Sequence, residues 1–148
     1  MFGQNVLYDY AMKLVGTPYK WGGDDPMSGL DCSGLCLELM QSVGVLPHNQ
    51  DLNSQGMYTR MTIDGCPVRE KAKFGSLIFF GKDATKISHV AFCLNDQLMI
   101  EAGGGTSRTR HINDAIRDNA YVRVRPIATR SDRVAVVMPK YRWEKDGE

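Results

Sequence analysis

The hydrophobic period of this 148-residue chain changes near its middle, and this change constrains the fold more than any other feature. In the first half, apolar residues recur at three- and four-residue spacing, which predicts helices over about 5–15, 32–43 and 54–61. The second half holds short runs of β-prone residues separated by turn-forming residues, a pattern typical of strands. Helices followed by strands favour an α+β fold in which the N-terminal helices pack against an antiparallel sheet.

Five segments of the second half are expected to form that sheet. They are SLIFFG (76–81), HVAFCLN (89–95), QLMIEAG (97–103), YVRVRPI (121–127) and RVAVVMP (133–139). No repeat, low-complexity tract or linker separates the two halves of the chain. A composition of 43% hydrophobic and 24% charged residues is ordinary for a soluble protein. We therefore expect one domain spanning residues 1–148.

Residues 16–31, GTPYKWGGDDPMSGLD, join the first two helices and are rich in glycine and proline. This composition argues against a regular element and indicates a shaped, functional loop. At its end, Asp31 is placed to cap the helix that begins at or near Cys32. Unpaired N–H groups and the helix dipole favour negative charge there, so a thiol at this position is stabilised as the reactive thiolate. Cys32 is therefore the candidate nucleophile, and a buried structural cysteine at a helix start is the alternative.

The other three cysteines lack this setting. Cys36 lies one turn further into the helix, and both Cys36 and Cys93 lie in apolar runs, where they are expected to be small buried hydrophobes. The cysteines, including Cys66, do not form paired CxxC units, which argues against a zinc ribbon. A chain of this length can also bury a core without disulfides. We expect no metal site and no cofactor.

A nucleophilic cysteine requires a base, and the chain offers three histidines. His48 and His111 lie in polar segments, whereas His89 opens an apolar strand, where a rigid backbone can hold an imidazole at hydrogen-bond distance from a thiol. A third group would fix the tautomer of the imidazole and stabilise its charged form. Glu101 lies on the following strand, and antiparallel pairing could bring it beside His89. The sequence thus predicts a triad of Cys32, His89 and Glu101, with an outward-facing Glu101 as the alternative.

Four separated motifs strengthen this interpretation. They are Gly16-Thr17-Pro18-Tyr19-Lys20-Trp21-Gly22-Gly23, Asp31-Cys32-Ser33-Gly34, Phe74-Gly75-Ser76-Leu77-Ile78-Phe79-Phe80 and Ser88-His89-Val90-Ala91. Their order and spacing over about 7–105 resemble those of the NlpC-type cell-wall peptidases, which are papain-like cysteine peptidases. The resemblance implies a papain-like fold and hydrolysis of an amide bond in peptidoglycan stem peptides, typically between γ-D-glutamate and a diamino acid.

The resemblance also implies roles for individual residues. Cys32 would be the nucleophile, with its main-chain N–H as an oxyanion donor, and His89 would be the base. Four further residues would bind substrate: Tyr19, Trp21, Asp31 and Ser33. In some relatives the residues at the positions of Asp31 and Ser33 hold a free amine of the peptide. The third catalytic residue of the family is often His, sometimes Asn or Gln, so Glu101 is a departure. The related CHAP amidases pair Cys and His with an acidic partner, but the loop at 16–23 fits the NlpC type better.

Two other functions stay open. Papain-like domains of this kind also act as amidases or acyltransferases on other γ-glutamyl or lipid amides. The chain could instead be a non-catalytic, wall-binding structural phage protein, although the presence of a cysteine, a histidine and an acceptor counts against a decayed site. Nucleic-acid binding is not expected, because the formal net charge is +1 and no recognised motif occurs.

The charge of the chain is uneven, since residues 107–148 hold ten Lys/Arg and six Asp/Glu. These basic residues could contact an anionic cell-wall polymer, but alternation with apolar residues favours a solvated strand face.

The N-terminal segment has no basic region followed by an apolar run, so no signal peptide is expected, and no run is long enough for membrane insertion. A lone domain without leader or wall-binding repeats resembles the NlpC-type domains that occur in phage tail or lysis components. We expect synthesis in the cytoplasm and action at the cell wall, in a form that could be virion-associated.

Overall fold

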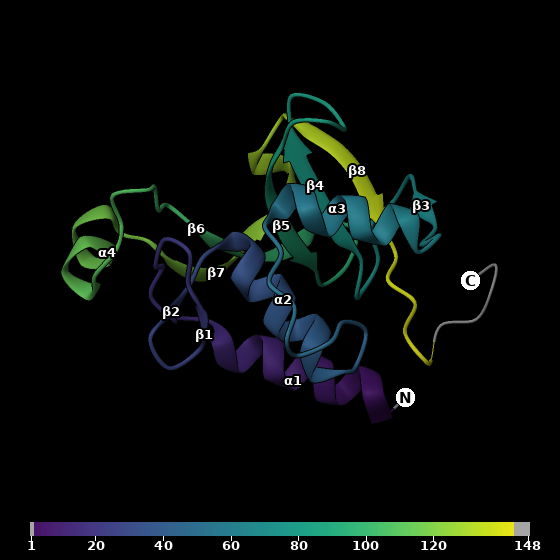
Figure 1. Cartoon of the computed structure of the whole chain (residues 1–148), viewed down its shortest axis with the longest axis horizontal. Helices are drawn as coiled ribbons and strands as arrows, with labels where there is room; N and C mark the ends of the chain where they lie inside the picture. The colour runs from purple at the N-terminus through teal and green to yellow at the C-terminus, as the bar shows by residue number, and fades with distance from the viewer. Residues whose placement is uncertain (1, 144–148) are drawn as a thin grey trace.

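The computed structural model describes residues 2–143, and within them the chain forms four α-helices and a six-stranded antiparallel sheet (Figure 1). This confirms the α+β fold with helices packed on an antiparallel sheet. Residues 1 and 144–148 of the expected domain lie outside the described residues, and its extent over 1–148 stays a prediction.

Two of the four helices begin at a capping side chain. The helices are α1 (Phe2–Leu14), α2 (Cys32–Ser42), α3 (Ser54–Ile63) and α4 (Ile112–Asp118), with a short 3₁₀ turn, η1 (Ile127–Thr129). Asp31 Oδ1 accepts a hydrogen bond from Gly34 N at 2.7 Å before α2. Asn53 Oδ1 accepts one from Gly56 N at 2.7 Å before α3. Each cap contributes about 1 kcal/mol. Over residues 2–143, no helix is long and apolar enough to cross a membrane.

The sequence pattern predicts α1, α2 and α3, with ends shifted by a turn or less, but not α4. The reason is that α4 buries Ala115 alone, while Ile112 and Ile116 are 54% and 60% exposed. A helix without an apolar stripe leaves no periodic signal in the sequence.

The five predicted strands are confirmed, and the sheet order is β3-β8-β4-β5-β6-β7. The strands are β3 (Val68–Arg69), β4 (Leu77–Gly81), β5 (Ile87–Cys93), β6 (Leu98–Gly103), β7 (Tyr121–Pro126) and β8 (Arg133–Val137). β3 is too short for the pattern to predict. β5 begins two residues before His89, so His89 lies inside the strand and does not open it.

The expectation that residues 16–31 hold no regular element is wrong. β1 (Asp24–Asp25) and β2 (Gly29–Leu30) form a small antiparallel pair in this loop. Gly29 has a φ of +145°, a conformation that other residues rarely adopt. Glycine, which prevents long elements here, also permits the tight hairpin.

The main hydrophobic core lies between α1, α2 and α3 and one face of the sheet (Figure 1). Leu39 and Met40 of α2 are fully buried in this core, as are Phe79 of β4 and Phe92 of β5. Burial of one such side chain contributes about 1.5–3 kcal/mol. α2 contacts both β5 and β6, so its N-terminal end is held against the two strands that carry the predicted base and its acidic partner.

Candidate active site

Cys32 is the first residue of α2, as the sequence predicts, and its side chain is half-buried. The glycine-rich loop packs directly on this end of the helix. A Cβ at Gly34 would come within 1.9 Å of the Gly23 carbonyl oxygen, so only glycine fits there without a shift of the backbone. Asp31 also accepts a bond from Gly22 N at 3.1 Å. The loop and the helix start therefore form one unit that fixes the position of the thiol.

His89 and Glu101 lie on the adjacent antiparallel strands β5 and β6. His89 Nε2 is 2.7 Å from Glu101 Oε1, and the two residues are 8% and 1% exposed. The second oxygen of Glu101 accepts a bond from Arg125 Nη1 of β7 at 3.1 Å. The basic residues of this strand are therefore not all solvated, and Arg125 helps to neutralise a buried carboxylate. Glu101 faces His89, and the outward-facing alternative is wrong.

The surroundings of His89 favour its protonated form. Burial lowers the pKa of His89, but hydrogen bonds to Cys32 and Glu101 and the charges of both outweigh burial and raise it to about 9. Burial raises the pKa of Glu101, but the bond to His89 and the charges of His89 and Arg125 hold it below its usual range. These shifts favour an imidazolium beside a carboxylate at neutral pH. A cationic imidazole next to a cysteine stabilises the thiolate.

Cys32 and His89 open into a cavity of about 350 Å³, which we call the reaction cavity. All four predicted substrate-binding residues line it: Tyr19, Trp21, Asp31 and Ser33. Glu101 lies behind His89, away from the cavity. The fold thus brings together the loop 16–31, the start of α2 and the pair β5 and β6 at one place.

An acidic cavity of about 450 Å³ adjoins the reaction cavity and shares Trp21, Asp31, Ser33 and Asn53 with it. It adds the carboxylates of Asp24 and Asp51. Burial raises the pKa of Asp31 against the opposing effect of its hydrogen bonds from Gly34, Ser33 and Gly22. No lysine or arginine lines this cavity within residues 2–143. Its chemistry suits a cationic group such as an amine.

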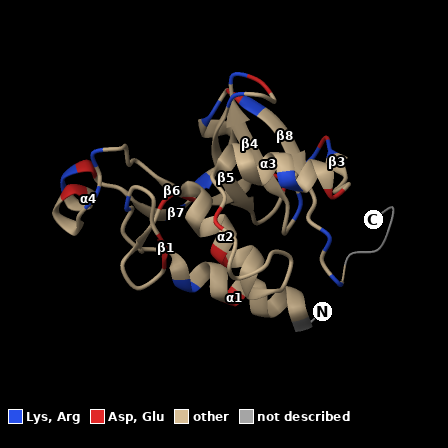
Figure 2. Ribbon diagram, in the orientation of Figure 1, with Lys and Arg blue, Asp and Glu red and all other residues tan. Residues whose placement is uncertain are grey.

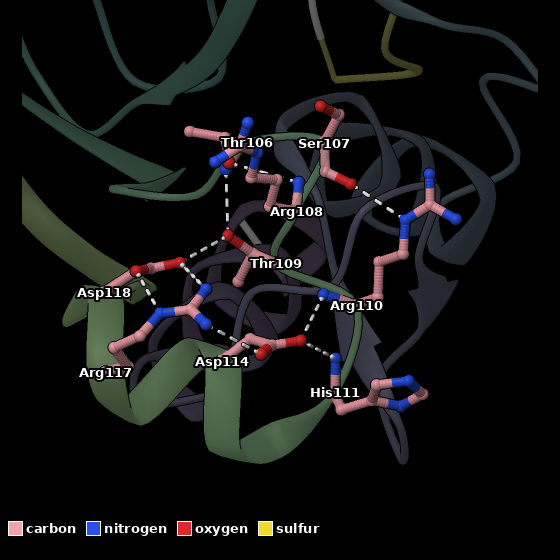
Figure 3. Close-up of polar contacts among 9 residues, drawn as sticks. All are labelled: Thr106, Ser107, Arg108, Thr109, Arg110, His111, Asp114, Arg117 and Asp118. Carbon is pink, nitrogen blue, oxygen red and sulfur yellow. Dashed lines mark hydrogen bonds and ion pairs between the residues drawn. The ribbon is translucent and has the colours of Figure 1, made fainter.

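The segment 104–120 supports the loop side of the reaction cavity. Gly105 lies so close to Tyr19 that a Cβ there would be 2.1 Å from the Tyr19 ring. Trp21 N donates to Thr109 O at 2.7 Å. Polar contacts within the segment hold it in shape (Figure 3), among them the bond from Thr109 Oγ1 to Asp118 Oδ2 at 2.9 Å. The sequence pattern does not predict this support.

Besides Gly105, six other residues of the reaction cavity are absent from the sequence-based prediction: Asn53, Ser54, Ser88, Ala102, Gly103 and Arg130. Ser88 precedes His89 in the chain, so its place near the site could have been predicted from the sequence. Asn53 and Arg130 come from segments that only the fold brings here. The other histidines, His48 and His111, are exposed and line neither cavity.

The remaining three cysteines are buried and form no disulfide: Cys36, Cys66 and Cys93. Burial of Cys36 and Cys93 is expected from the sequence. Across the part of the chain that the structure describes, no three or more His, Cys, Asp or Glu side chains form a group that could hold a metal ion.

Comparison with known sequences identifies the family of the chain. The sequence model of the NlpC/P60 family matches residues 16–126. The chain is 32% identical over 108 residues to dipeptidyl-peptidase 6 of Lysinibacillus sphaericus, a match that covers 70% of this chain and 34% of that protein. It is 35% identical over 101 residues to a probable endopeptidase of Mycobacterium tuberculosis, covering 67% of this chain and 23% of that protein. The chain thus spans about a third or less of these relatives.

Solved structures share the fold of this chain. The NlpC/P60 domain of the peptidoglycan hydrolase SagA superposes with a TM-score of 0.63 at 26% identity, covering 90% of this chain and 97% of that one. RipD of Mycobacterium tuberculosis, described as a non-catalytic NlpC/P60 protein adapted to peptidoglycan binding, has the same fold, with a TM-score of 0.63 at 19% identity, covering 93% of this chain and 97% of that one.

Proposed function

The chain belongs to the NlpC/P60 family, and from this premise we propose that it is a cysteine endopeptidase that cleaves peptidoglycan stem peptides. The observation that carries the proposal is the shared reaction cavity of Cys32 and His89, with Glu101 bound to His89 at 2.7 Å. A domain that only binds peptidoglycan does not need a buried carboxylate to orient an imidazole toward a thiol.

The proposed reaction follows from this geometry. The Cys32 thiolate attacks the carbonyl carbon of the peptide, and the main-chain N–H of Cys32 at the helix start stabilises the oxyanion. When the C–N bond breaks, protonated His89 gives its proton to the leaving amine, and a thioester remains on Cys32. His89 then takes a proton from water, which attacks the thioester, and the C–S bond breaks to release the acid and restore the thiolate beside protonated His89. Glu101 keeps the imidazole ring in one orientation throughout.

The bond that suits the site best lies between γ-D-glutamate and a diamino acid. The acidic cavity beside Cys32 supports this choice, because Asp31 and Ser33 could hold the free amine of a short stem peptide. Charge-assisted hydrogen bonds of this kind are stronger than neutral ones. Other γ-glutamyl or lipid amides are the alternative substrates, and the phage setting stays a prediction.

Digestion of diaminopimelate-type peptidoglycan by the wild type and by Cys32→Ala tests the proposal, with the fragments identified by mass spectrometry. We expect fragments that end in free γ-D-glutamate from the wild type alone. Release by both proteins would show that Cys32 is not the nucleophile. Release by neither, with both folded, would refute the proposed substrate and favour another amide.

A further inference from the structure

A groove lined by two lysines, which we call the basic groove, adjoins the reaction cavity away from the residues that the acidic cavity shares with it. This groove has a volume of about 650 Å³ and meets the reaction cavity at Ser88, the residue before His89. Its lining is Gly81, Lys82, Lys86, Ile87, Ser88 and Asp132. In Figure 1 the loop between β4 and β5, which carries both lysines, lies at the top of the molecule, and the hairpin β1 and β2 lies at the lower left.

Arg130 lines the reaction cavity and pairs with Asp132, which lines the groove. Its guanidinium carbon is 4.9 Å from the centre of the Phe80 ring. Asp132 accepts from its Nε at 3.0 Å and from its Nη2 at 2.8 Å. These bonds leave the donors of Nη1 for a ligand. A guanidinium held on two sides is well suited to bind a carboxylate, because little side-chain freedom is lost on binding.

The lysines of the groove are free to contact a ligand, whereas its aspartate is already paired. The carboxylate of Asp132, which lines the groove, is engaged with Arg130. Asp83 of the same loop is not among the lining residues, and the bonds from Thr85 lower its pKa. The side chains of Lys82 and Lys86 are exposed. Figure 2 shows basic positions on the β4–β5 loop and near the start of β8 at the top of the molecule, with an acidic position in the same loop. The groove thus presents positive charge to a ligand.

The mechanism decides which part of the substrate lies in each direction. His89 must reach the leaving amine, so the leaving amino acid lies on the His89 side of the reaction cavity, toward Ser88. The acyl part lies on the side of Asp31, which precedes Cys32. We propose that Arg130, assisted by Lys82 and Lys86, binds a carboxylate of the leaving amino acid, so that the cleft selects short peptides with a free amine at one end and a free carboxylate at the other. This inference rests on the proposed function and names the substrate class of that site.

Two peptides that differ in the two carboxylate charges of the leaving amino acid test the inference. The first is L-Ala-γ-D-Glu-diaminopimelate with free carboxylates on the diamino acid, and the second has both of these as carboxamides. For the wild type we expect kcat/KM to be at least about tenfold higher for the free acid, mainly through KM, because the binding hydrogen bonds are charge-assisted. Arg130→Gln should lose this preference, because the KM for the free acid should rise more than the KM for the carboxamide.

The control variant is Arg60→Gln. Arg60 also pairs with an aspartate, Asp64 at 3.0 Å, and its side chain is 34% exposed against 32% for Arg130, but it lies on α3 outside the cleft. This variant should keep the full preference. Equal cleavage of the two peptides by the wild type, or an unchanged preference in Arg130→Gln, would overturn the inference.

Binding separates this inference from the proposed reaction. Calorimetry with Cys32→Ala, and with Cys32→Ala combined with Arg130→Gln, measures affinity for both peptides without turnover. Tighter binding of the free acid that is lost in the double variant supports the carboxylate site even if the wild type cleaves neither peptide. Equal binding of the two peptides, or binding of neither, refutes it.

Discussion

Glu101→Gln tests how the buried ion pair serves both stability and catalysis. Glu101 is 1% exposed, and its oxygens contact His89 Nε2 at 2.7 Å and Arg125 Nη1 at 3.1 Å. Glutamine has the same shape and can still accept a hydrogen bond from His89. It cannot balance the charges of the imidazolium and the guanidinium. The substitution therefore removes charge while it changes packing little.

The size of the effect follows from the pKa of His89. That pKa is raised from 6.5 to about 9 by Cys32 and Glu101 together. At 1.36 kcal/mol for each pKa unit, the shift corresponds to roughly 3 kcal/mol, which the two partners share. We therefore expect Glu101→Gln to lower the free energy of unfolding by about 1–3 kcal/mol near pH 6, in line with the loss of one partner of a buried pair.

The pH dependence has a definite sign. Because folding raises the pKa of His89, its stabilisation is fully present below 6.5 and is lost as pH rises through about 9. Folding lowers the pKa of Glu101, so its contribution is present above the ordinary value of 4.5 and is lost as pH falls through the lower folded value. The difference between wild type and Glu101→Gln should be largest from about pH 4.5 to 6.5 and should shrink by pH 10.

Urea unfolding at pH 6 and pH 10 measures this difference. In activity assays, kcat/KM should fall on the order of 10²–10⁴-fold, and the alkaline limb of the pH profile should move to lower pH because His89 loses its proton more easily. Glu38→Gln is the control, since Glu38 of α2 also accepts a short bond, from Tyr10 Oη at 2.5 Å, but lies outside the cleft. A stability difference that is the same at both pH values, or full activity in Glu101→Gln, would refute the reasoning.

Three further predictions follow from the site and its supports. Iodoacetamide at pH 6.5 should modify Cys32 before the buried cysteines, and His89→Ala should slow this reaction at least about tenfold; equal rates by mass spectrometry would contradict the thiolate–imidazolium pair. Gly34→Ala should lower stability by about 1–3 kcal/mol in thermal unfolding, because its Cβ would meet the Gly23 carbonyl oxygen at 1.9 Å; an unchanged Tm would show that the loop can move aside. Thr109→Val should cost about 1–3 kcal/mol and raise KM more than it lowers kcat, because Thr109 Oγ1 is buried and bonded while its carbonyl holds Trp21; kinetics with an unchanged KM would show that this segment does not shape the cavity.

Local patterns in the sequence determined most of the helices and strands and the three residues of the predicted triad. The hydrogen bond by which Asp31 caps α2 joins residues only three positions apart. The start of α2 at Cys32 can therefore be predicted from neighbouring residues alone. His89 and Glu101 lie on consecutive strands joined by a short turn, so antiparallel pairing was enough to predict their contact. Interactions between residues close in the sequence can be predicted from residue types and hydrophobic periodicity.

The tertiary structure alone decided the surroundings of these residues. β8 pairs between β3 and β4, an order that does not follow the chain, and this pairing carries Arg130 and Asp132 to the His89 side of the cavity. Asp51 and Asn53 reach the other side from the connection before α3. No periodicity or spacing encodes these approaches, because they arise from strand order and helix packing between distant segments. For that reason the sequence predicts the reacting groups, while the acidic and basic ends of the cleft emerge only from the fold.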